Sequence, residues 1–151
     1  MSVKLLIDAD ACPVTRIAER VAKDYGVPCT LVCDTAHQMT SDYSQTVIAS
    51  KGRDCADFVL LSMVTRNDVV VTQDYGLAAL CLAKGASAIN QSGMEYTSQN
   101  MDGLLNSRHI NAKARRAGGR IKGPSKRTKE QDAAFEKAFR NLLERSIAEN
   151  E

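Results

Sequence analysis

Two short apolar runs, each followed by an acidic residue, constrain the fold of this chain more than any other feature. Residues 3–7 are mostly apolar and lead directly into Asp8, and residues 69–72 are followed closely by Asp74. A continuous apolar run, without alternating polar residues, is typical of a strand buried on both faces. Such strands form parallel sheets that helices cover on both sides. We therefore expect an α/β protein with a mostly parallel sheet.

Strand-like and helix-like segments continue to alternate along the chain. Pro13 suits the first turn of a helix, because proline lacks the N–H group that would stay unbonded there, and Gly26 is suited to end that helix. Strands are expected over residues 3–7, 29–33, 46–49, 69–72 and 86–89. Further helices are expected from Asp54 or Asp57, from Leu77 and from Ser98.

The segment 130–149 predicts an amphipathic helix at the C-terminus. Thr128 and Gln131 have the spacing of a capping box at its start. Such a helix must bury its apolar face against the sheet or against a partner. The apolar residues at helical spacing are Phe135, Phe139, Leu142, Leu143 and Ile147.

Charge is distributed unevenly, although the formal net charge is only +2. Nine lysines and arginines, and no acid, lie between Arg108 and Lys129. Unopposed cations favour contact with phosphate groups, so we expect a nucleic acid as partner. The length of 151 residues suits a single domain, 1–151, in which 108–129 is a basic segment before the last helix. The residues expected to contact phosphates are Arg115, Arg116, Arg120, Lys122, Lys126 and Arg127.

The sequence favours an intracellular location. Asp8 interrupts the apolar start too early for a signal peptide, and no uncharged apolar run approaches the ~18 residues that span a bilayer. The five cysteines contain no C-x-x-C pair, which argues against a structural zinc site and for reduced thiols. We therefore expect a cytoplasmic protein without a membrane partner, and the oligomeric state stays open.

Carboxylates are expected to gather at one edge of the sheet. Asp8, Asp10 and Asp74 follow strands, and the carboxyl ends of parallel strands line the ligand crevice. Asp57, near Asp54, lies at the start of the helix between these strands. Two carboxylates ~5 Å apart repel by about 3 kcal/mol at an effective dielectric constant of 20. A cation would relieve this repulsion, so Asp8, Asp10, Asp57 and Asp74 predict a site for Mg²⁺ or Mn²⁺, which prefer oxygen ligands.

Each acid also has a structural interpretation. Asp8 or Asp10 can cap the helix that follows the first strand. Asp57 can favour a helix start through the macrodipole, while Asp54 and Asp74 can belong to turns or caps.

Three other residues have alternative roles. Cys12 would be a reactive thiolate if a helix N-terminus lowered its pKa. His37, after the second strand, is either a phosphate ligand or a surface residue. His109 adds only occasional positive charge to the basic segment.

Several strings of residues resemble one family. Over nearly its whole length the chain is similar to the YaiI/YqxD family of uncharacterised bacterial proteins. The D-A-D-A-C-P-V string is specific, and the C-terminal pattern G-G-R-I-K-G-P-S-K-R also matches. The matching residues are 7–14, 54–57, 70–78, 83–86 and 118–127.

This resemblance implies a fold and a chemistry. The family is regarded as similar to PIN-like nucleases, which implies a PIN-like three-layer α/β/α fold with a mostly parallel sheet of four or five strands. It also implies that Asp8, Asp57 and Asp74 are the catalytic acids. The fourth acid usual in PIN domains has no clear match here.

Three functions fit these observations. The first is a nuclease that uses Mg²⁺ or Mn²⁺ to hydrolyse phosphodiesters of RNA or DNA. The second is a phosphatase like the haloacid dehalogenases, with Asp8 as nucleophile and Asp10 as acid/base, although Cys12 departs from that pattern. The third is a nucleic-acid-binding protein without turnover.

Overall fold

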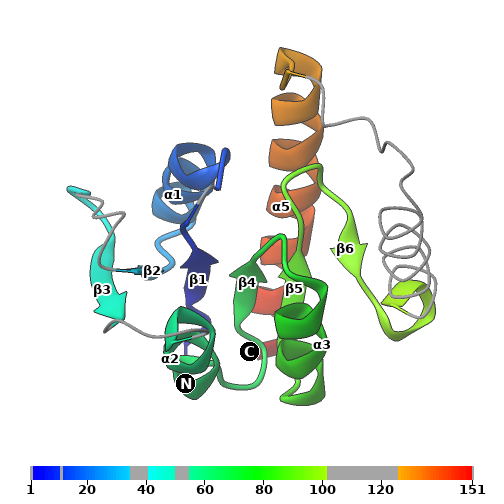
Figure 1. The fold of residues 1–151 in the computed structure, drawn as a ribbon. Helices are drawn as coiled ribbons and strands as arrows, with labels where there is room; N and C mark the ends of the chain where they lie inside the picture. The colour runs from blue at the N-terminus through cyan, green and yellow to red at the C-terminus, as the bar shows by residue number, and fades with distance from the viewer. Residues whose placement is uncertain (1, 11, 35–40, 50–54, 102–125, 151) are drawn as a thin grey trace, which may run out of the picture.

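The computed structural model describes residues 2–10, 12–34, 41–49, 55–101 and 126–150. Their strands form one six-stranded sheet in the order β3-β2-β1-β4-β5-β6 (Figure 1). The first five strands in this order are parallel to one another, and β6 is antiparallel to β5. The bounds are β1 Leu5–Asp8, β2 Cys29–Asp34, β3 Gln45–Ala49, β4 Val69–Val71, β5 Ser87–Ile89 and β6 Glu95–Tyr96.

All five expected strands are therefore present, and the α/β class with a mostly parallel sheet is confirmed. Strand β6 is an addition at the sheet edge. With only two residues, Glu95 and Tyr96, it is too short to show the period of two by which strands are predicted.

The helices alternate with the strands as expected. Their bounds are α1 Thr15–Asp24, α2 Cys55–Met63, α3 Tyr75–Ala83 and α5 Lys129–Asn150. Residues 98–101 are also helical, and the rest of the helix expected there lies outside the described residues. Among the residues described, no helix combines the length and the apolar character needed to cross a bilayer.

Helix α1 shows where the sequence prediction needed correction. It begins at Thr15 with Val14 as its N-cap, so Pro13 precedes the helix by two residues and is not its first residue. Its end is as predicted: Gly26 follows with φ +68°, a left-handed conformation that glycine adopts without strain.

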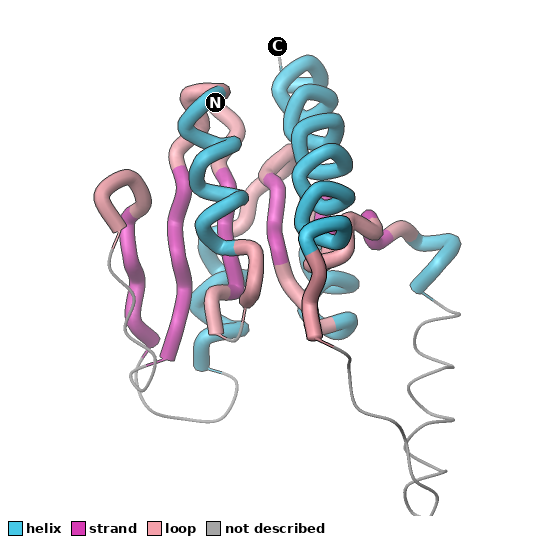
Figure 2. The backbone as a smooth tube through the Cα atoms, turned by 90° about the horizontal axis from the view of Figure 1, so that it is seen from above, coloured by secondary structure: helices cyan, strands magenta, loops and turns pink. Residues whose placement is uncertain are grey.

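Helices cover both faces of the sheet, which gives three layers. Because side chains alternate along a strand, Leu5 and Ile7 of β1 face α1 and α5, while Leu6 faces α2 and α3. Figure 1 shows α2 and α3 in front of the strands and α5 behind them. Figure 2 shows the strands side by side in one sheet with helices packed across them.

Helix α5 packs on the chain's own sheet. Phe135 and Phe139 are fully buried beside Leu142 and Leu143 in the same core as α1. The capping box is confirmed: the Thr128 N–H donates to Gln131 Oε1 at 2.8 Å, and the Gln131 N–H donates to Thr128 Oγ1 at 3.2 Å.

Candidate active site

The strand register places Asp8 at the edge where the parallel strands end. Ile7 pairs with Val71 across β1 and β4, so the next residues, Asp8 and Thr72, are neighbours. The alternation that turns Leu6 and Val70 toward α2 and α3 turns Asp8 and Thr72 the same way. The Thr72 hydroxyl, which is buried, donates to Asp8 Oδ2 at 2.9 Å.

Asp74 is connected to Asp8 through the same hydroxyl group. The Asp74 N–H donates to Thr72 Oγ1 at 3.1 Å. The Asp74 side chain caps α3, because its Oδ1 accepts from the N–H groups of Gly76 and Leu77 at 2.8 and 3.2 Å. The structural interpretation of Asp74 is thus confirmed. Both capping bonds use the same oxygen, so they are compatible with a ligand role for this carboxylate.

The expected acids lie within electrostatic reach of Asp8. The pKa of Asp8 is raised to about 6, chiefly by burial, while the Thr72 hydrogen bond lowers it. The charges of Asp57, Asp10 and Asp74, in that order, contribute to the rise. Asp57 lies in the first turn of α2, where the helix dipole favours an acid. Asp57, Asp10 and Asp74 are thus close enough to Asp8 to influence its titration.

Asp10 does not cap α1. Its carboxylate accepts the backbone N–H of Asp34, at 3.1 Å to Oδ2 and 3.4 Å to Oδ1. The N-cap of α1, Val14, makes no side-chain hydrogen bond. Asp10 thus ties the end of β1 to the end of β2. Three residues considered from the sequence, His37, Asp54 and His109, lie outside the described residues.

The donor chemistry of the site suits a hard cation, although no closed cage is present. Within the described part of the chain, no group of three His, Cys, Asp or Glu residues is spaced to hold a metal ion. Mg²⁺ commonly takes only one or two carboxylates and completes its shell with water and substrate phosphate. Asp8, Asp57 and Asp74 present only oxygen atoms, so one or two of these carboxylates could hold Mg²⁺ or Mn²⁺ in this open manner.

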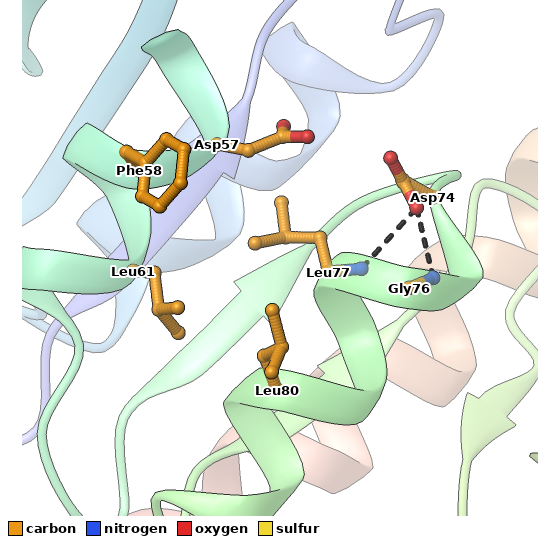
Figure 3. A pocket seen from close by; sticks show the side chains of 7 residues that line it. All are labelled: Asp57, Phe58, Leu61, Asp74, Gly76, Leu77 and Leu80. Atoms are coloured by element: carbon orange, nitrogen blue, oxygen red, sulfur yellow. Dashed lines mark hydrogen bonds between the residues drawn. The ribbon is translucent and has the colours of Figure 1, made fainter. Parts of the chain in front are cut away.

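A pocket of about 300 Å³ lies between α2 and α3, beside these acids. Figure 3 shows the carboxyl groups of Asp57 and Asp74 at one end and leucine side chains toward the other. Phe58 and Leu80 at the pocket are 70% and 53% exposed. The full lining is Asp57, Phe58, Leu61, Asp74, Gly76, Leu77 and Leu80.

Sequence reasoning missed the pocket for a physical reason. Helix α2 is apolar on nearly all sides between Phe58 and Met63, so its periodicity does not show which face is exposed. Only the packing of the helix on the sheet, through Leu60 and through Val64 just after its end, turns Phe58 outward.

Of the basic segment, the structure describes the end, from Lys126 onward. Arg127 Nε donates to Asp132 Oδ1 and Arg127 Nη2 to the Gln91 carbonyl, each at 2.5 Å. The pKa of the Cys12 thiol is raised by the charge of Asp8 and lowered by that of Arg127, so Cys12 lies within reach of both. Lys126 is exposed. Arg115, Arg116, Arg120 and Lys122 lie outside the described residues.

The structure argues against the alternative role of Cys12 as a reactive thiolate. Burial is the main influence on Cys12 and raises the pKa of its thiol above the usual value. Because Cys12 precedes the first turn of α1 and is partly buried, desolvation outweighs any favourable field from the helix N-terminus.

Comparison with known proteins identifies the family. The UPF0178 protein of Clostridium acetobutylicum is 53% identical over 145 residues, covering 95% of this chain and 98% of its own. The UPF0178 proteins of Ruminiclostridium cellulolyticum and Exiguobacterium sibiricum are 50% and 48% identical, covering 91% and 93% of this chain and 90% and 96% of their own. No solved structure matches significantly. The family profile described as uncharacterised, YaiI/YqxD, matches residues 6–145, and the chain therefore belongs to the YaiI/YqxD family.

Proposed function

We propose that this protein is a divalent-metal-dependent nuclease that hydrolyses phosphodiester bonds in RNA or DNA. The observation that carries the proposal is the gathering of Asp57, Asp10 and Asp74 around a half-buried Asp8 at the carboxyl edge of the sheet. Mutual repulsion makes such an arrangement unfavourable for folding, so a role in binding a cation accounts for it better than a role in stability. The resemblance to PIN-like nucleases points the same way.

One or two of the carboxylates of Asp8, Asp57 and Asp74 would hold the metal, and water and the substrate phosphate would complete its shell. When bound, Mg²⁺ or Mn²⁺ supplies a Lewis acid that offsets the negative charge of a phosphodiester under attack. Thr72 is a positioning residue, because its hydroxyl group fixes the Asp8 carboxylate and holds the Asp74 backbone. Its hydrogen bond also lowers the pKa of Asp8, so that this carboxylate is mostly ionised at neutral pH.

The basic segment would supply the affinity for the nucleic-acid backbone. Arg127 is held at the start of α5 by Asp132 and by the Gln91 carbonyl, and the exposed Lys126 precedes it. Cations of this segment would hold the phosphate backbone of a nucleic acid at the protein surface. Charge reversal at Arg115, Arg116 and Arg120 should therefore weaken binding and make the affinity less dependent on salt.

The decisive test is cleavage of labelled RNA and DNA oligonucleotides with Mg²⁺, with Mn²⁺ and with a chelator. Cleavage should require the metal and should be lost in Asp8→Asn. The matched control is Asp42→Asn, which makes the same change at an exposed acid before β3 and should cleave normally. Circular dichroism would establish that both variants are folded.

Two other outcomes would contradict the nuclease proposal. Binding that is sensitive to salt, but unaffected by chelator and by Asp8→Asn, would show a nucleic-acid-binding protein without turnover. Release of phosphate from small phosphomonoesters, with a phosphorylated Asp8 trapped by acid, would show a phosphatase.

A further inference from the structure

The pocket between α2 and α3 shares two of its walls with the proposed metal site. Asp57 and Asp74 belong to both, so a group bound in the pocket lies directly beside any ion that these carboxylates hold. The remaining side chains that line the pocket are apolar, and Phe58 leaves most of its surface open to solvent. Leu80 at the same pocket is also exposed, and neighbouring exposed apolar side chains of this kind are typical of a binding site.

We propose that this pocket holds an unpaired nucleobase stacked on Phe58, which makes a single-stranded nucleic acid the substrate. The inference rests on the proposed nuclease function for its placement of the phosphate. A nucleotide combines a flat, largely apolar base with an anionic phosphate. The pocket offers an apolar wall for the base. The carboxylates at its edge, once they hold a cation, would offer a site for the phosphate.

The volume of the pocket suits a single base better than a larger ligand. About 300 Å³ is at the lower end of the range for ligand pockets, roughly 300–1,000 Å³. A base within a duplex is paired and stacked on its neighbours, so its faces are not accessible to Phe58. A base in a single strand is accessible, and aromatic side chains bind such bases by stacking.

The lining also predicts little discrimination between bases. The N–H groups of Gly76 and Leu77 already donate to Asp74 Oδ1 and are not available to read a base edge. The apolar side chains offer no hydrogen bonds. Stacking accepts every base and should favour purines, because of their larger faces.

The test exploits the absence of tryptophan from this chain. In Phe58→Trp the new indole is the sole tryptophan and reports stacking through quenching of its fluorescence. The probes are a single-stranded oligoadenylate DNA, a strand of the same length with stable abasic residues, and a duplex, each mixed in Mg²⁺ and read before turnover. Ile48→Trp is the matched control, since Ile48 of β3 is 43% exposed and does not line the pocket.

We expect the oligoadenylate to quench Phe58→Trp strongly and the abasic strand and duplex to quench it little. Ile48→Trp should respond to none of them. Phe58→Ala should weaken single-strand binding about tenfold, the size of effect that loss of one base stack produces. Equal quenching by the abasic strand, equal quenching of Ile48→Trp, or no quenching at all would overturn the proposal.

Failure of this inference is distinguishable from failure of the nuclease proposal. Metal-dependent cleavage with no selective quenching would contradict the base pocket and support the nuclease proposal. Selective quenching by the oligoadenylate without cleavage would support the base pocket and contradict the nuclease proposal.

Discussion

The Thr72 hydroxyl group donates a hydrogen bond of 2.9 Å to Asp8 Oδ2 and accepts one of 3.1 Å from the Asp74 N–H. A single buried hydroxyl group therefore joins the ends of β1 and β4 with the start of α3. Tyr96 of β6 supports the same residue, because its hydroxyl group donates to the Thr72 carbonyl at 3.2 Å. The Thr72 side chain is thus hydrogen-bonded to both acidic residues.

Replacing Thr72 with valine should raise the pKa of Asp8 above its value of about 6, because the hydrogen bond that favours the ionised form is lost. Titration of the Asp8 carboxyl carbon by NMR measures this. The fold should also lose about 1–3 kcal/mol, since the Asp74 N–H loses its acceptor. Thr72→Ser keeps the hydroxyl group and should titrate as the wild type does. An unchanged Asp8 pKa in Thr72→Val would contradict the proposed role.

Asp8→Asn should stabilise the fold at neutral pH while removing activity. The folded-state pKa of Asp8, about 6, lies above the ordinary value of 3.8, so the folded state binds more protons between these values. The wild type therefore loses stability as pH rises from about 4 to about 6, by at most about 3 kcal/mol. The variant should be the more stable protein at pH 7, and the difference should vanish near pH 4.

Chemical denaturation of both proteins across this pH range measures the effect on the free energy of unfolding. Asp42→Asn controls for the general loss of one negative charge. A wild type that is more stable than Asp8→Asn at pH 7 without metal would show that Asp8 is stabilised by its surroundings.

Addition of Mg²⁺ or Mn²⁺ should raise the melting temperature, because a ligand that binds only the folded state stabilises it. At a concentration of about 100 times Kd the gain is about 2.7 kcal/mol. The gain in melting temperature should shrink below pH 6, because protons then compete with the metal for the Asp8 carboxylate. Differential scanning calorimetry of the wild type, Asp57→Asn and Asp42→Asn tests this. Of the three proteins, only Asp57→Asn should show a smaller rise in melting temperature with the metal.

Gly93→Ala should destabilise the packing of α5 on the turn between β5 and β6. Gly93 has φ +90°, and a Cβ atom there would lie 2.9 Å from the Ala134 carbonyl oxygen, so an alanine is both strained and in collision. We expect a loss of about 2–4 kcal/mol. Gly26 has φ +68°, and a Cβ atom there would have no atom within 4 Å. Gly26→Ala therefore measures the backbone strain without a collision, and we expect a loss of about 1 kcal/mol. Equal losses by thermal unfolding would contradict the close contact.

Local patterns in the sequence were sufficient for much of the fold. The apolar run before Asp8 predicted a central parallel strand, since a strand buried on both faces needs apolar residues at every position. Thr128 and Gln131 predicted the start of α5 because a capping box involves only neighbouring residues. Asp8 and Asp74 were predicted at one edge because parallel strands all end on the same side.

Tertiary structure decided what depends on contacts between distant residues. Asp10 bonds the Asp34 N–H in place of capping α1, and burial outweighs the helix field at Cys12. Phe58 is exposed because the sheet selects another face of an almost uniformly apolar α2. The sequence by itself thus determined the strands and the acids that follow them. The pocket beside those acids exists only because packing, which no local period encodes, sets the rotation of each helix.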